Sequence, residues 1–437
     1  MSIPTVALVG RPNVGKSTLF NRLVGKRIAI IDDLPGITRD RIYGDVNYND
    51  IKFHLVDTGG IDVTPELFNK EIIIQAEIAI EASDVIVFVV DGKEGLTSND
   101  YAVRDMLFKS KKRVIVAINK ADNKKINDNI YEFYELGLNE YIEISAEHGN
   151  GINSLLDLIT SNFEIKEEIE YSEDIIKFCL VGRPNVGKSS LVNALLNEER
   201  VIVSDKAGTT RDAIDSPFTY NKKDYVVIDT AGIRKRGKLF ENIEKYSVLR
   251  AIKAIERSDV SLLIIDAEAG IIEQDKHITS YIVESGKAVV IVVNKWDLAG
   301  DQDIKGFTKL IREEFKFMPY APIVFLSAKT RKRIHTLMPE VDKVFENAKR
   351  RVSTSTLNNV IVEAVELSPP PSYKGKRLKV YYSTQVDIAP PKFVFHVNNK
   401  SLIHFSYERY LENKIREAFN FEGTPIILQF KNRGENK

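Results

Sequence analysis

The sequence predicts an α/β protein built from two similar tandem halves, followed by a smaller α+β segment. Two observations predict this fold class. The string GRPNVGKS at residues 10–17 returns letter for letter at residues 182–189. Around each copy, short apolar runs rich in β-branched residues alternate with helical segments, which is typical of a mostly parallel sheet flanked by helices. A chain of 437 residues is long enough for two or three domains with cores of their own.

The first half, residues 1–160, shows this alternation from its start. Apolar runs predict strands at 5–9, 52–56, 84–90, 113–118 and 141–144. Helical patterns are expected to begin after Lys16 and near Glu71, Asn99, Ile130 and Gly151. Residues 161–174 are acidic and poor in core formers, which predicts a linker.

The alternation restarts in residues 175–348, the second half. The expected elements are strands at 176–181, 226–228, 260–266, 288–293 and 323–326 and a helix at 337–348. Residues 349–437 show a different alternation of apolar and polar residues and contain no copy of the repeated string. They predict a small α+β domain with antiparallel pairing, with helices at 356–366 and 407–419 and strands at 378–386, 392–397 and 425–430.

Charge and cysteine content bound the class of protein. The net charge is zero, but residues 349–437 hold 15 Lys and Arg against 8 Asp and Glu, an excess of +7. Cys179 is the only cysteine, which excludes an internal disulfide and predicts a reducing, cytoplasmic location with the thiol buried in a strand. An apolar run begins by Thr5, too early for a signal peptide, and no apolar run is long enough to span a membrane.

Both copies of the repeated string match the phosphate loop G-x-x-x-x-G-K-[ST]. Backbone N–H groups of such a loop and of the helix after it face a β-phosphate. The lysine is expected to bridge β- and γ-phosphate oxygens, and the serine to ligate Mg²⁺. The predicted phosphate-binding residues are Gly10, Arg11, Pro12, Asn13, Val14, Gly15, Lys16 and Ser17, and Gly182, Arg183, Pro184, Asn185, Val186, Gly187, Lys188 and Ser189.

Two further motifs follow each loop at equal intervals. Thr38 and Thr210 lie 22 residues after the loop lysines and are expected to sense the γ-phosphate and complete the Mg²⁺ shell. The D-x-x-G strings begin 41 residues after the lysines, where the Asp would hold Mg²⁺ through water. With the residue after each, they are Asp57, Thr58, Gly59, Gly60 and Ile61, and Asp229, Thr230, Ala231, Gly232 and Ile233.

The residues expected to act in hydrolysis itself are a subset of these motifs: Lys16, Thr38, Asp57, Gly60, Lys188, Thr210, Asp229 and Gly232.

Two N-K-x-D strings predict which nucleotide base each site binds. A carboxylate only accepts hydrogen bonds, so it suits the two N–H donors of guanine and disfavours adenine. A later Ser-Ala pair would supply a backbone N–H for guanine O6. These residues are Asn119, Lys120, Asp122, Ser145 and Ala146, and Asn294, Lys295, Asp297, Ser327 and Ala328. The set indicates GTP and GDP rather than ATP as ligands.

These five elements in this order resemble a translation-factor-class GTPase of the phosphate-loop superfamily. Two tandem copies, an acidic linker and a basic C-terminal segment resemble the bacterial tandem-domain GTPases of the Der (EngA) family, within the TrmE-Era-EngA-like group. The resemblance implies a KH-like C-terminal domain, here without a G-x-x-G loop, and GTP hydrolysis in assembly of the large ribosomal subunit. It implies binding to that subunit and its rRNA in a nucleotide-dependent way. We expect no membrane partner and a monomer, because no heptads appear.

Ile61 and Ile233 stand where Ras-type enzymes place a water-orienting Gln, which predicts slow intrinsic hydrolysis. The resemblance assigns Asn13 and Asn185 to a K⁺ ion; the alternative is that each Asn only stabilises its loop. Arg39 and Arg211 are weaker candidates for arginine fingers acting in cis. Residues 329–333 (KTRKR) lack the glycines of the first copy, which predicts a differently shaped base loop, facing RNA or solvent.

Two other functional classes fit less well. An RNA-modifying enzyme timed by GTP would need a nucleophile or ligand cluster, and the six histidines form no metal spacing. A GTP-dependent membrane scaffold would need an amphipathic basic helix or a lipidation motif, and neither is found. The basic runs at 234–238 and beyond residue 349 fit phosphate contacts and ordinary solvated faces alike.

Overall fold

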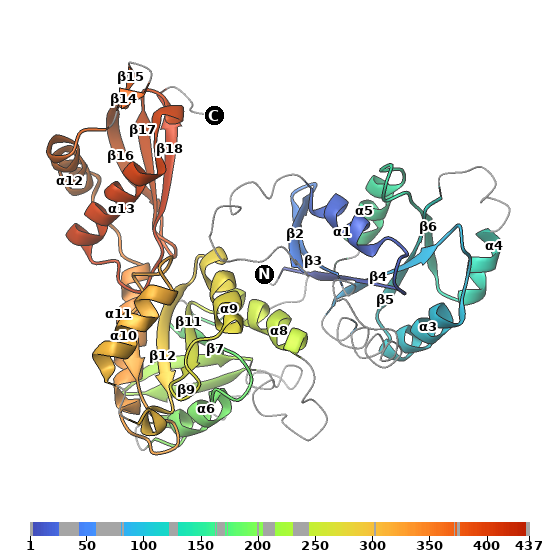
Figure 1. Cartoon of the computed structure of the whole chain (residues 1–437), viewed down its shortest axis with the longest axis horizontal. Helices are drawn as coiled ribbons and strands as arrows, with labels where there is room; N and C mark the ends of the chain where they lie inside the picture. Colours follow the sequence, from blue (N-terminus) through green and yellow to red (C-terminus); the bar gives the residue numbers. More distant parts are fainter. Residues whose placement is uncertain are drawn as a thin grey trace. The chain divides into compact units, whose positions relative to one another are not determined.

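The computed structural model describes residues 3–25, 43–57, 80, 83–121, 130–161, 163, 171–172, 174–198, 201–203, 215–229, 244–300, 303–370, 372–373 and 376–433. The chain divides into two compact units, Met1–Glu168 and Ile169–Lys437 (Figure 1). The division falls inside the acidic segment 161–174, most of which lies outside the described residues. Among the described helices, none is long and apolar enough to cross a membrane.

The first unit is built on a six-stranded sheet in the order β2-β3-β1-β4-β5-β6. Only β2 and β3 pair antiparallel; the other neighbours are parallel. β4 and β5 are buried on both faces, which is why they read as continuous apolar runs. The strands are β1 (Thr5–Val9), β2 (Tyr43–Tyr48), β3 (Ile51–Asp57), β4 (Val85–Asp91), β5 (Arg113–Asn119) and β6 (Glu140–Glu143).

Helices cover both faces of this sheet because strand side chains alternate in direction. Val6 and Leu8 pack in one buried layer with side chains of α1 and α5. Ala7 and Val9 pack in the opposite layer with α3 and with Phe133. The helical elements are α1 (Lys16–Val24), α3 (Ser98–Ser110), α4 (Ile130–Phe133), the 3-10 turn η1 (Tyr134–Leu136) and α5 (Ile152–Thr160). The helix expected near Glu71 lies outside the described residues.

The second unit repeats the plan with a seven-stranded sheet in the order β13-β12-β11-β7-β10-β9-β8. Its strands are β7 (Ile176–Val181), β8 (Val201–Val203), β9 (Ser216–Tyr220), β10 (Lys223–Ile228), β11 (Val260–Asp266), β12 (Ala288–Asn294) and β13 (Ile323–Phe325). Its helical elements are α6 (Lys188–Leu196), α8 (Glu244–Arg257), α9 (Glu273–Glu284), η2 (Trp296–Leu298), α10 (Ile304–Glu314), η3 (Ile334–Thr336) and α11 (Leu337–Ala348). Cys179 is fully buried in β7, as predicted.

The end of the chain forms one layer of strands and one layer of helices, which we call the C-terminal layer pair. A three-stranded sheet, β16-β17-β18, packs against α12 and α13. β16 and β17 pair antiparallel, but β17 and β18 pair parallel, so the expectation of antiparallel pairing is wrong for β18. The helix α13 lies between β17 and β18 and returns the chain in the same direction. The elements are α12 (Thr354–Leu367), β14 (Ser372–Tyr373), β15 (Lys376–Arg377), β16 (Val380–Asp387), β17 (Lys392–Val397), η4 (Lys400–Leu402), α13 (Phe405–Phe419) and β18 (Ile427–Asn432).

The loop before β18 attaches this C-terminal layer pair to the seven-stranded sheet. The amide of Val289 in β12 donates to the Gly423 carbonyl at 2.7 Å, and the Gly423 amide donates to the Tyr320 carbonyl at 2.8 Å. The Asn347 amide group of α11 donates to the Glu422 carbonyl at 3.0 Å. The Arg416 guanidinium lies 4.6 Å from the centre of the Tyr320 ring. Backbone and side-chain contacts thus join the two parts within one compact unit.

Candidate nucleotide-binding sites

In the first unit, the predicted phosphate loop connects β1 to α1. Gly15 is the N-cap of α1, with φ of 94°, and the loop folds over the side chain of Lys16. The Lys16 ammonium donates to the carbonyls of Gly10 at 2.8 Å and Arg11 at 2.7 Å. Burial lowers the pKa of Lys16 to about 8, and nearby Asp57 partly offsets this. The loop therefore holds its lysine at the N-terminus of a helix, where an anion binds favourably.

Two of the expected Mg²⁺ ligands lie side by side. Asp57 ends β3, which pairs with β1, so its carboxylate reaches the start of α1. The Ser17 hydroxyl donates to this carboxylate at 2.8 Å. Hydroxyl and carboxylate oxygens are hard donors of the kind that Mg²⁺ prefers. The two residues therefore fit the ion that the sequence predicts.

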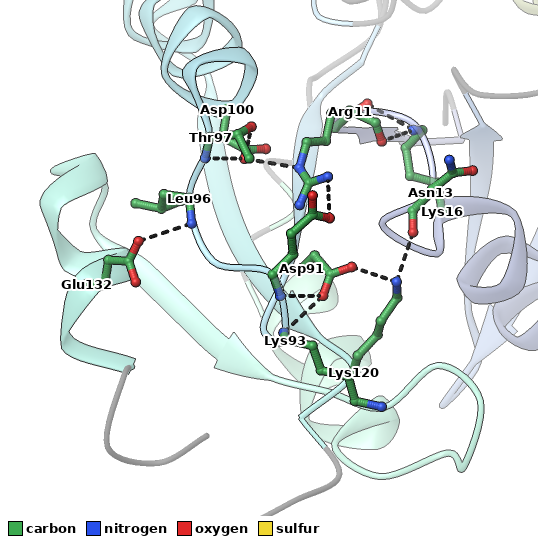
Figure 2. A network of polar contacts seen from close by, with 12 residues as sticks. Arg11, Asn13, Lys16, Asp91, Lys93, Leu96, Thr97, Asp100, Lys120 and Glu132 are labelled. Carbon is green, nitrogen blue, oxygen red and sulfur yellow. Dashed lines mark hydrogen bonds and ion pairs between the residues drawn. The ribbon is translucent and has the colours of Figure 1, made fainter. Parts of the chain in front are cut away.

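Asn119, the last residue of β5, ties the phosphate loop to the base-recognition loop. Its amide group donates to the Val14 carbonyl at 2.8 Å, and its oxygen accepts from the Ala146 amide at 2.9 Å. The side chain is buried, so both backbone groups depend on it for their hydrogen bonds. Lys120 follows with a left-handed backbone and donates to the Asn13 carbonyl at 3.0 Å (Figure 2).

The second unit repeats these contacts. Lys188 donates to the carbonyls of Gly182 at 2.5 Å and Arg183 at 2.8 Å. The Asn294 amide group donates to the Val186 carbonyl at 2.8 Å and accepts from the Ala328 amide at 2.9 Å. The N-K-x-D aspartate of this unit, Asp297, is exposed in η2. Identical strings have therefore folded into the same local network.

The base loop of the second unit corrects one expectation. The missing glycines predict a different shape, but the Ser327 amide donates to the Lys332 carbonyl at 3.0 Å, as Ser145 does to Asn150. Arg331 and Arg333 adopt the left-handed conformations that Gly149 and Gly151 adopt in the first unit. Hydrogen bonding to the buried Ser-Ala segment holds the turn despite the unfavourable φ at two arginines. Residues 329–333 are exposed.

Acidic residues form a network next to each phosphate loop that the sequence did not predict. The Arg11 guanidinium donates to Asp100 at 3.1 Å and to Glu94 at 2.8 Å (Figure 2). Asp100 is fully buried and also accepts from the amide and hydroxyl of Thr97, at the N-terminus of α3. Asp91, the last residue of β4, accepts from Lys120 at 2.5 Å. The loop is therefore connected through side chains to both β4 and α3.

The second unit has the same plan with weaker contacts. Lys295 donates to Asp266 at 2.5 Å, but the Arg183 guanidinium lies 3.5 Å from Asp275. Burial raises the pKa of Asp275, and Arg183 only partly offsets this. The sequence signal for this network is a pair of aspartates nine residues apart after each phosphate loop, at 91 and 100 and at 266 and 275.

Several predicted site residues lie outside the described part of the chain, together with the finger candidates Arg39 and Arg211 and the basic run 234–238. They are Thr38, Thr58, Gly59, Gly60, Ile61 and Asp122, and Thr210, Thr230, Ala231, Gly232 and Ile233. Asp229 ends the described part of its segment, and its amide donates to Asp215 at 3.1 Å.

Comparison with known proteins agrees with the two repeated sites. A family model described as "50S ribosome-binding GTPase" matches residues 5–120 and 177–295. A second, "KH-domain-like of EngA bacterial GTPase enzymes, C-terminal", matches residues 351–431. A protein of Geobacillus named GTPase Der is 57% identical over 430 residues, which are 98% of this chain and 99% of the relative. The chain belongs to the GTPase Der family.

Der proteins of other bacteria agree equally well. The one from Listeria monocytogenes is 56% identical over 435 residues, 99% of this chain and all of the relative. Among solved structures, the G domain of FeoB from Methanococcus jannaschii is 27% identical and covers 37% of this chain and 97% of its own, with a TM-score of 0.29. As a member of the Der family with two GTPase domains and a KH-like domain, the protein binds and hydrolyses GTP.

Proposed function

We propose that this GTPase is a switch in ribosome biogenesis, acting in assembly of the large subunit and binding ribosomal RNA in a nucleotide-dependent way. The observation that carries this proposal is the ribosome-binding family model, which matches both repeated domains. The basic C-terminal segment, with its excess of +7, supports contacts to phosphate. The domains proposed are 1–160, 175–348 and 349–437 around the linker 161–174, in a cytoplasmic monomer.

The site assignments form part of the same proposal. Lys16 and Lys188 contact the β- and γ-phosphates, and Asp122 and Asp297 accept from the guanine N–H groups. Ser17, Thr38 and Asp57, and their counterparts Ser189, Thr210 and Asp229, hold Mg²⁺. The contact between Ser17 and Asp57 supports this set. Bound Mg²⁺ would neutralise charge on the phosphates, while the loop amides orient them.

The proposal includes stimulation of a slow hydrolysis by K⁺. Asn13 and Asn185 are exposed on their loops, and the amide oxygen of each is a hard donor that suits a K⁺ ion. Ile61 and Ile233 cannot orient a water. A monovalent cation beside the phosphates would supply the positive charge that an arginine finger supplies elsewhere.

We expect faster GTP turnover in K⁺ than in Na⁺ at equal ionic strength. The variant Asn13→Ala with Asn185→Ala should lose this difference, because each loop loses its amide oxygen. Steady-state phosphate release in the two buffers measures it, with Asn153→Ala, an exposed Asn on α5, as the matched control. Equal turnover of the wild type in K⁺ and Na⁺ would refute the assignment.

Co-sedimentation with ribosomal subunits tests the function as a whole. The full chain is mixed with purified large and small subunits, with GDP or a non-hydrolysable GTP analogue, at graded salt. We expect pelleting with the large subunit that depends on the nucleotide and weakens as salt rises. Absence of pelleting in every nucleotide state, despite tight GTP binding, would contradict the ribosomal role and leave the GTPase sites in place.

A further inference from the structure

The C-terminal sheet presents a face that the nucleotide sites do not use. On one face, Phe393 and Phe395 of β17 pack with α12 and α13 in a buried cluster. Their register partners Gln385 and Ser383 are buried with them. Because side chains alternate along a strand, the neighbouring pair Tyr382 and His396 points to the opposite face. We call this second side the open face; its strands carry the red colours at the end of the chain in Figure 1.

A row of three side chains crosses the open face. The rings of Tyr382 and His396 stack with their centres 4.2 Å apart and their planes 12° from parallel. Tyr382 is 46% exposed. Lys431 of β18 is the register partner of His396, so its ammonium lies on the same face beside the stack. The row therefore joins a flat aromatic surface to a cation.

A second aromatic–cation pair lies next to this row. The register of β16 shifts between Val380 and Tyr382, which leaves Tyr381 as an extra residue of a bulge, 46% exposed. Arg433 follows Lys431 by two residues, and its guanidinium lies 4.9 Å from the centre of the Tyr381 ring. We name the five residues Tyr381, Tyr382, His396, Lys431 and Arg433 the open-face patch.

Charge is separated between the two sides of this part of the chain. Asp387 is the only carboxylate of β16, β17 and β18, and it lies at the end of β16 away from the patch, opposite Lys392. The helices α12 and α13 carry five glutamates against three basic residues, an excess of two negative charges: Glu363, Glu366, Glu408, Glu412 and Glu417 against Arg409, Lys414 and Arg416. A polyanion is therefore attracted more strongly to the sheet side than to the helices.

We propose that the open-face patch binds single-stranded RNA, with a base stacked on the Tyr382–His396 pair and phosphates contacted by Lys431 and Arg433. Unstacked bases have an open π-face, which aromatic side chains bind without regard to sequence. Bases within a duplex are already stacked on each other, which favours loops and bulges over helices. The proposal rests on the proposed function only for the identity of the RNA as ribosomal.

Fluorescence anisotropy of the full chain with a labelled single-stranded oligouridylate tests this, in GDP and in a GTP analogue. The variant Tyr382→Ala with His396→Ala should bind the strand at least about tenfold more weakly, since stacking is lost. Tyr382→Phe, which keeps the ring, should bind like the wild type. Lys431→Gln should lower the slope of log affinity against log salt by about one.

Phe405→Ala is the matched control. Phe405 is an exposed aromatic residue on α13, 61% exposed, with the Arg409 guanidinium 5.4 Å from its ring centre, but it lies on the helical side. It should retain affinity for the strand. A hairpin duplex of equal charge is the second probe and should bind more weakly than the single strand. Unchanged GTP turnover in each variant shows that its GTPase domains have folded, and an unchanged circular dichroism spectrum shows that its C-terminal sheet has folded.

The outcomes separate this inference from the proposed function. Wild-type affinity in the double alanine variant, or no oligonucleotide binding by the wild type in either nucleotide state, would overturn the patch; the face would then serve a protein contact. Loss of strand binding in that variant, with normal binding by Phe405→Ala, supports the patch even if the wild type fails to pellet with ribosomes. If the double alanine variant no longer binds the oligonucleotide but still pellets with ribosomes, the patch binds free single-stranded RNA and its assignment to rRNA is overturned.

Discussion

Gly15 stands where the phosphate loop enters α1, and its conformation leaves no space for a side chain. Its φ is 94°, and a Cβ there would collide with the Asn119 amide group that supports the loop. We predict that Gly15→Ala lowers the stability of the first unit by about 3 kcal/mol and GTP affinity at least about tenfold. Urea-dependent hydrogen exchange of β1 and α1, with nucleotide titration, measures both.

Gly137 provides the control, because it has the same left-handed conformation, with φ of 67°, and a Cβ there would make only an ordinary contact with Phe108 at 3.5 Å. Gly137→Ala should cost only the strain of the left-handed conformation, about 1 kcal/mol, and leave GTP affinity unchanged. Equal effects of the two substitutions would show that strain alone, and not the collision with Asn119, explains the glycine at position 15.

At the residue scale, the fixed motifs predicted the two phosphate loops, which the structure places between β1 and α1 and between β7 and α6. The identical strings led to identical hydrogen bonds at Lys16 and Lys188, because the backbone of the loop accepts from its own lysine. Arg11 was predicted only as a member of the string. Its partners, Asp100 and Glu94, are distant in the sequence, and nothing local to the motif specifies which carboxylates the fold brings there.

The connection between Arg11 and α3 acts at the scale of whole elements. Arg11 and Asp100 are both buried, so removal of the guanidinium leaves an uncompensated carboxylate at the N-terminus of α3 (Figure 2). We predict that Arg11→Met destabilises the first unit by about 3–5 kcal/mol. The amides of α3 and of the loop should lose protection together in hydrogen-exchange measurements, since one side chain holds both elements.

Arg183→Met is the counterpart in the second unit. The Arg183 guanidinium lies 3.5 Å from Asp275, and the Arg183 side chain is more exposed than that of Arg11. The second substitution should therefore open α9 less than the first opens α3. Equal loss of protection in the two units would contradict the view that the tighter carboxylate contacts of Arg11 hold α3 in place.

Central elements were more predictable than edge elements. The bounds of β7, β11 and β17 match the apolar runs because these strands are buried, and burial selects continuous apolar sequence. β2 and β9 were missed, since strands such as YGDVNY are half polar and are defined by pairing with β3 and β10. The direction of β18 depends on the path through α13, which no local pattern encodes.

At the scale of the molecule, the C-terminal layer pair is attached to the second GTPase domain at Gly423. This residue has φ of 81°, and a Cβ there would collide with Val344 of α11. Its amide and carbonyl also bond to Tyr320 and Val289. Such close backbone contact couples two hydrophobic cores, so we expect the second unit to unfold in one cooperative step.

Gly423→Ala should break this coupling. The layer pair would separate from the GTPase domain, so peptides of α13 and β18 should lose hydrogen-exchange protection at lower urea than peptides of β11 and β12. Gly270→Ala is the matched control, because Gly270 has φ of 67° and open space for a Cβ. If α13 and β11 still open together in Gly423→Ala, other contacts, such as the Lys343–Glu422 ion pair at 2.6 Å, are sufficient to keep the two hydrophobic cores coupled.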